Sequence, residues 1–125
     1  MTRQSLSDKR MISELEAGRK WLLSEPSAST LLQNLRRGLQ SITRNIYVFH
    51  SIPEQYEVLY DVLVDGKIVV HIELPRDTHS DEVVFEKLGI EEYLNTRKHI
   101  GKMDRRRLTL ALELAQDRAR RMDEA

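Results

Sequence analysis

Residues 56–74 read YEVLYDVLVDGKIVVHIEL, and this stretch decides the fold. Apolar and polar residues alternate on both sides of Asp65-Gly66, a pair that is typical of a hairpin turn. A three-residue loop, 64–66, pairs Val62 with Ile68 and makes one face of the hairpin wholly apolar, whereas a two-residue loop mixes both faces. We therefore expect the three-residue loop, with Gly66 in the left-handed region.

The same alternation predicts one further strand upstream, at Ile46–His50. Closing this hairpin with a loop over residues 51–55 completes a three-stranded antiparallel meander between Ile46 and Leu74, and it places His50 on the apolar face. The opposite face is then half apolar and half acidic, which is unusual for a solvated surface. Either this face is an exposed contact surface, or the helices after Pro75 cover it as a second core layer. It carries Tyr47, Phe49, Glu57, Leu59, Asp61, Val69, His71 and Glu73.

Helical spacing flanks the meander on both sides. Ser5 and Asp8 form a capping box before the first apolar stripe, and Pro26 separates that stripe from a second one capped by Ser27. The expected helices cover residues 5–23, 27–42, 83–88, 90–94 and 102–122. The predicted fold class is therefore α+β, in a single domain over residues 1–125. It has an N-terminal αα-hairpin, the meander, a short helix and a long C-terminal helix, with helices on the face of Val58, Tyr60 and Val70.

Composition limits the function classes. The chain has 125 residues and no cysteine, which excludes disulfides, thiolate metal sites and cysteine nucleophiles. We expect a cytoplasmic protein, because disulfides mark oxidising compartments and no secretory leader is visible. No apolar run approaches the roughly 18 residues that span a bilayer, so no membrane association is expected.

The formal net charge of zero hides an uneven distribution. Lys and Arg number 8 against 4 Asp and Glu in residues 1–50, 3 against 11 in residues 51–96, and 9 against 5 in residues 97–125. An acidic middle between basic ends indicates either neutralisation within the fold or a partner of one sign on one face.

Catalytic signatures are missing from the sequence. It contains no phosphate-loop, dinucleotide-binding, zinc-hydrolase or nucleophile-elbow motif. The histidines His50, His71, His79 and His99 have no spacing that places two on one helix face for a metal. His71 near Asp61 and Glu73 is compatible with acid–base chemistry, but a structural cross-strand histidine is the preferred interpretation of the pattern. We predict no cofactor, no metal and no catalytic residue, and we expect a non-enzymatic protein.

Two surfaces remain as functional hypotheses. The first is the acidic, half-apolar sheet face, which would bind a protein partner or a second copy of the chain in a homodimer, with Glu57, Asp61 and Glu73 selecting a basic partner. The alternative is nucleic-acid binding by the basic C-terminal helix. Its candidate residues are Arg97, Lys98, Lys102, Arg105, Arg106 and Arg107.

The stretch 56–62, followed by Gly66-Lys67-Ile68-Val69-Val70 and Arg76, resembles the central hairpin of RelE/ParE-type toxins, in which two helices precede a meander. The resemblance covers about a sixth of the chain and implies a ribosome-dependent ribonuclease or a gyrase poison. Glu57 stands where that family usually has arginine.

Overall fold

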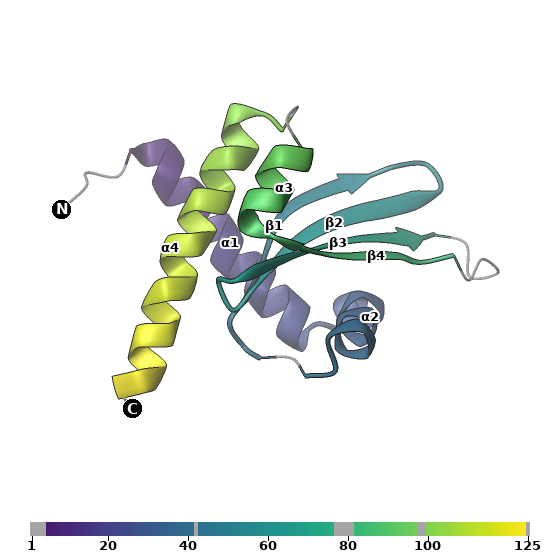
Figure 1. Ribbon diagram of the computed structural model, residues 1–125, viewed down its shortest axis with the longest axis horizontal. Coiled ribbons are helices and arrows are strands. Elements are labelled where there is room, and N and C mark those ends of the chain that lie inside the picture. Colours follow the sequence, from purple (N-terminus) through teal and green to yellow (C-terminus); the bar gives the residue numbers. More distant parts are fainter. Residues whose placement is uncertain (1–4, 42, 77–81, 98–99, 125) are drawn as a thin grey trace.

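The computed structural model describes residues 5–41, 43–76, 82–97 and 100–124, without the side chains of residues 122–124. Two N-terminal helices precede an antiparallel sheet, and a short helix and a long helix follow it (Figure 1), which confirms the α+β class. The elements are α1 (Leu6–Ser24), the 3-10 helix η1 (Pro26–Ala28), α2 (Ser29–Leu39), β1 (Ile46–Pro53), β2 (Glu57–Val64), β3 (Ile68–Pro75), β4 (Val84–Gly89), α3 (Ile90–Thr96) and α4 (Lys102–Glu124).

The helix starts follow local capping rules in part. Ser5 caps α1 as expected, since its hydroxyl accepts from the backbone N–H of Asp8 at 3.0 Å. Ser27 does not cap α2. It lies in η1 and accepts instead from Trp21 Nε1 at 2.8 Å, which ties the end of α1 to the turn. Ile42, the expected end of the second helix, lies outside the described residues.

The sheet has four strands in the order β1-β2-β3-β4, so the three-stranded prediction is one strand short. Residues 84–89 form β4 and not the expected short helix. Pairing with β4 satisfies the outer backbone groups of β3, and β4, the shortest of the four strands, becomes an edge of the sheet. The Phe85 ring then packs onto α2, where a Cβ on Gly38 would lie 2.3 Å from it.

The hairpin between β2 and β3 closes one residue later than predicted. Val64 pairs with Ile68 and Val62 with Val70, so the loop is 65–67. Asp65 and Gly66 both have positive φ, 56° and 66°, and the N–H of Lys67 donates to the Val64 carbonyl at 3.0 Å. The shift moves each partner by two positions, and the predicted apolar face is therefore kept.

The register of β1 differs more. Ile46 pairs with Val64, and a β-bulge between Val48 and His50 then shifts the pairing so that His50 lies opposite Asp61. The bulge turns both Phe49 and His50 to the face of Tyr47. The prediction that His50 lies on the face of Val58 and Tyr60 is therefore wrong.

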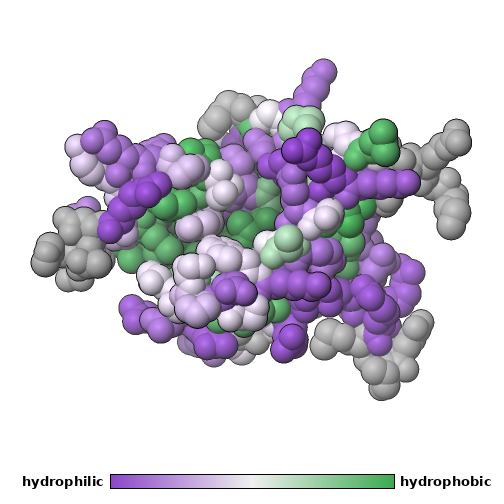
Figure 2. All heavy atoms as spheres, turned by 180° about the vertical axis from the view of Figure 1, so that it is seen from behind, coloured by the Kyte–Doolittle hydropathy of each residue, from purple (hydrophilic) through white to green (hydrophobic). Residues whose placement is uncertain are grey.

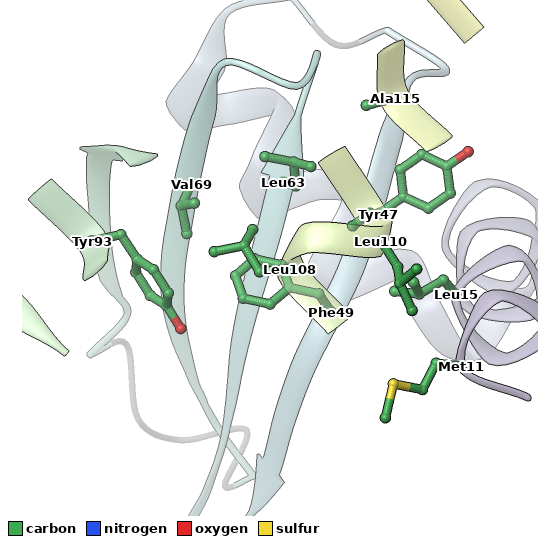
Figure 3. Close-up of a cluster of buried hydrophobic side chains, with 11 residues drawn as sticks. Met11, Leu15, Tyr47, Phe49, Leu63, Val69, Tyr93, Leu108, Leu110 and Ala115 are labelled. Atoms are coloured by element: carbon green, nitrogen blue, oxygen red, sulfur yellow. The ribbon is translucent and has the colours of Figure 1, made fainter. Parts of the chain in front are cut away.

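Helices cover both faces of the sheet, the second of the two arrangements that the sequence left open. The face that includes Val62, Val70 and Ile72 packs against α2 and the end of α1. The other face packs against α3, α4 and the first half of α1 (Figure 3), with Leu108 set among Phe49, Leu63 and Val69. The Tyr47 and Tyr93 hydroxyls lie at opposite edges of this second cluster.

The back of the molecule is mostly hydrophilic, with hydrophobic atoms gathered left of centre in Figure 2. Within the described chain, no helix is both long and apolar enough to cross a bilayer.

Candidate functional site

Three cross-strand rows follow one another along the face of the sheet that carries α3 and α4. Their members are in register across all four strands. The covered row is Tyr47, Leu63, Val69 and Leu88; the polar row is His50, Asp61, His71 and Glu86; and the open row is Ile52, Leu59, Glu73 and Val84. In Figure 1 the strand ends that carry the open row extend away from α3 and α4.

Asp61 is the centre of the polar row and is 5% exposed. Its Oδ1 lies 2.6 Å from His71 Nδ1, and its Oδ2 lies 3.0 Å from His50 Nδ1. The Tyr93 hydroxyl of α3 donates to the same Oδ2 at 2.8 Å. One buried carboxylate thus links β1, β2, β3 and α3.

The outer ring nitrogens of both histidines also face carboxylates. His71 Nε2 lies 2.8 Å from Glu73 Oε2, and His50 Nε2 lies 3.5 Å from Asp104 Oδ2 on α4. An imidazole satisfies two carboxylates only as the imidazolium, in which both nitrogens donate. We refer to His50, Asp61, His71, Glu73, Tyr93 and Asp104 as the histidine–aspartate network.

The network shifts the protonation equilibria of its members. The hydrogen bond to Asp61 raises the pKa of His50 and of His71 against the opposing effect of burial, with further support from Asp104 and Glu73, respectively. Burial by itself would raise the pKa of Asp61, but the hydrogen bonds from His50, His71 and Tyr93 outweigh it and hold that pKa well below its usual range. Burial and the Asp61 charge raise the pKa of Tyr93.

A pocket of about 270 Å³ opens between the polar row, the open row and the ends of α3 and α4. Apolar walls and a polar floor meet in it, an arrangement typical of recognition sites. The walls come from Ile52, Leu59 and Ile100, and the remaining lining residues are His50, Asp61, His71, Tyr93, Arg97, Gly101 and Asp104.

The open row exposes apolar surface beside negative charge. Ile52 and Val84 are each 38% exposed, and Leu59 and Glu73 are half-buried between them. Glu57 lies next along β2, and its pKa is raised by desolvation and then by the charges of Glu73 and Glu54. The carboxylates at this end of the sheet therefore repel one another.

The structure divides the eight residues predicted for the sheet-face site. Tyr47, Phe49 and Val69 are buried at 0–2% exposure under the helices, so the expectation that they serve as exposed anchors is wrong. Asp61 and His71 are neighbours as expected, but they lie in the buried network. Leu59, Glu57 and Glu73 remain at the open end of the face.

His71 is a poor candidate for acid–base chemistry, because both of its ring nitrogens are taken up by carboxylates. His50 was not predicted for this site, since the bulge that brings it there leaves no mark in the alternation. Tyr93, Ile100 and Asp104 were missed too, because they arrive from helices distant in sequence. In the described part of the chain, no group of three or more His, Asp or Glu residues is arranged to hold a metal ion.

Three of the six residues of the predicted basic cluster are paired with carboxylates within the fold. Arg106 donates to Asp8 of α1 at 3.0 and 2.6 Å. Arg107 donates to Glu14 at 3.1 Å, and Arg97 lies 3.8 Å from Glu86. Lys102 and Arg105 are exposed, and Lys98 lies outside the described residues.

Comparisons with protein-family models, curated proteins and solved structures find no match. The resemblance to RelE/ParE-type toxins therefore gains no support, and the case for a function rests on the site.

Proposed function

We propose that this chain is a non-enzymatic binding protein that recognises a basic, amphipathic segment of a protein partner at the open end of its sheet. The observation that carries the proposal is the open row, where Ile52, Leu59 and Val84 leave apolar surface uncovered beyond a polar row whose central residues, Asp61 and His71, are buried. On a sheet face that helices cover, apolar residues ordinarily extend only as far as the helices do. Here the apolar residues resume after the polar row.

Charge complementarity favours a basic partner. Glu57 and Glu73 lie at the open row, and Glu54 adds its charge at the adjoining hairpin. Such a field speeds the approach of a cationic surface and opposes an anionic one. The same repulsion disfavours two copies of the chain meeting face to face, so a foreign partner fits better than the homodimer expected from the sequence. A cytoplasmic location remains part of this proposal.

The test uses two fluorescein-labelled helical peptides with the same leucine spacing, one carrying lysine and the other glutamate at the polar positions. Fluorescence anisotropy at low salt is expected to show binding of the lysine peptide only, and the affinity should fall as salt is added. The double variant Leu59→Ser with Val84→Ser should lose most of this binding, because both apolar contacts of the open row are removed.

A matched control comes from the other exposed apolar pair. Leu6 and Met103 are 85% and 57% exposed and line a separate groove between the starts of α1 and α4. The variant Leu6→Ser with Met103→Ser should bind the lysine peptide as the natural chain does. Equal loss in both double variants, binding of the glutamate peptide, or self-association that excludes both peptides would contradict the proposal.

A further inference from the structure

The pocket beside the histidine–aspartate network suggests how a basic partner would be recognised. We propose that it receives one arginine or lysine side chain of the partner and that entry of this cation releases a proton from His50. The inference rests on the proposed function, whose open row borders the pocket through Ile52 and Leu59.

The shape of the pocket suits an alkyl chain that ends in a cation. At about 270 Å³ it lies just below the usual range of ligand pockets, so it accommodates a side chain and not a folded element. Ile52, Leu59 and Ile100 contact the stem, as apolar surface does for the methylenes of lysine and arginine. Asp61 and Asp104 lie beyond these walls, where the charged head arrives.

The arginines around the pocket already face carboxylates. Arg97 lies 3.8 Å from Glu86, and Arg107 donates to Glu14 at 3.1 Å. An anion entering the pocket would meet the carboxylates of Asp61 and Asp104. The cations that line the pocket, Arg97 and the imidazoliums of His50 and His71, are each already paired with a carboxylate, which weakens their attraction for a free carboxylate or phosphate.

His50 is the group whose protonation a guest cation would change. It faces Asp61 of β2 and Asp104 of α4, with Arg107 of α4 opposing its charge and Glu14 of α1 paired to that arginine. The contact of His50 with Asp104 is loose, at 3.5 Å, and the Asp104 side chain is 26% exposed. When a guanidinium pairs with Asp104, the imidazolium loses one of its two carboxylates and gains a cationic neighbour. The neutral form of His50 is then favoured.

His71 is expected to keep its proton. It is held by Asp61 at 2.6 Å and by Glu73 at 2.8 Å, and its side chain is 8% exposed. Glu57 and Glu86 add negative charge from β2 and β4, while Arg97 opposes it. Proton release should therefore come from His50 alone.

Because the guest binds the neutral form of His50 more tightly, its affinity should rise with pH through the His50 titration, by at most about tenfold per pH unit for one released proton. The probe is n-butylguanidinium, whose charge is constant over this range. Methyl NMR at pH 6.0 and pH 8.5 should show shifts at Ile52, Leu59 and Ile100, with at least about threefold tighter binding at the higher pH. Butyrate, the matched anion, should produce none of these shifts.

Two variants separate binding of the cation from release of the His50 proton. Asp104→Asn should weaken binding of n-butylguanidinium at both pH values. His50→Gln should bind the probe with no dependence on pH, because glutamine still donates to Asp61 but does not titrate. Should either variant fail to fold, the affinity of the natural chain for n-butylguanidinium at the two pH values still tests the inference.

Equal affinity at both pH values, or shifts with butyrate, would overturn the inference. If the lysine peptide binds the open row while n-butylguanidinium fails to shift the three pocket residues, the side-chain subsite is refuted and the proposed function stands. If neither the peptide nor n-butylguanidinium binds, both fail.

Discussion

Replacing Asp61 with asparagine tests the network that separates the covered row from the open row. Asp61 accepts from two histidines and Tyr93 at 2.6 to 3.0 Å while only 5% exposed. Removing the charge leaves two imidazoliums without their shared partner, and breaking a buried pair in this way costs about 3–5 kcal/mol. For a domain of this size the melting temperature should fall by roughly 10–20 °C.

The size of this loss should depend on pH. Both histidines have raised pKa values in the folded state, so their stabilising effect is complete below the unfolded value of about 6.5 and is lost as pH rises through the folded pKa. The pKa of Asp61 is lowered, so its own contribution is present above about 4 and is lost only in stronger acid. The natural chain should be most stable between about pH 4 and 6.5.

Urea unfolding followed by circular dichroism at pH 6 and pH 9 measures both effects. The gap in unfolding free energy between the natural chain and Asp61→Asn should be largest at pH 6 and should shrink at pH 9. Tyr93→Phe removes one bond to Asp61 and should cost about 1–2 kcal/mol. The control Asp117→Asn, on the exposed surface of α4, should change stability by less than about 0.5 kcal/mol. A gap for Asp61→Asn below about 1 kcal/mol, or one independent of pH, would refute the reasoning.

Three further predictions concern the packing and the basic surface. Gly38→Ala should destabilise the chain because its Cβ meets the Phe85 ring, yet in a Phe85→Ala background it should stabilise by about 1 kcal/mol through helix propensity; thermal melts of the four chains check the change of sign. Tyr47→Phe should lower the unfolding free energy by about 1–2 kcal/mol, since the hydroxyl accepts from Arg118 at 2.6 Å, and an unchanged urea midpoint would contradict this. If nucleic acid binds α4, retention on heparin should depend more on the exposed Arg105 than on Arg107, which is paired with Glu14; the reverse order would contradict the assigned ion pairs.

The sequence predicted the faces of the β2–β3 hairpin better than its register. Loops 64–66 and 65–67 give the same alternation, so hydrophobic patterning cannot distinguish them. The pairing of Val64 with Ile68 settles the later loop. Residues 83–88 were predicted as helix because their apolar spacing fits one locally. This segment forms a strand because it pairs with the outer edge of β3. The local sequence pattern does not show that such an edge is available.

The candidate site was partly visible. Alternation placed Asp61, His71 and Glu73 on one face, and the structure confirms their contacts. It could not show the bulge that turns His50 toward them, since the extra residue of the bulge leaves no mark in the alternation of apolar and polar residues. Nor could it show that α3 and α4 stop at the polar row, which divides the predicted face into a buried half and an open half.

The most direct test of the account is backbone amide NMR of the natural chain titrated with the lysine peptide. The account predicts shifts concentrated at Ile52, Leu59, Glu73 and Val84, with the first turn of α1 unaffected. Shifts along the groove of Leu6 and Met103 in place of the open row would contradict it.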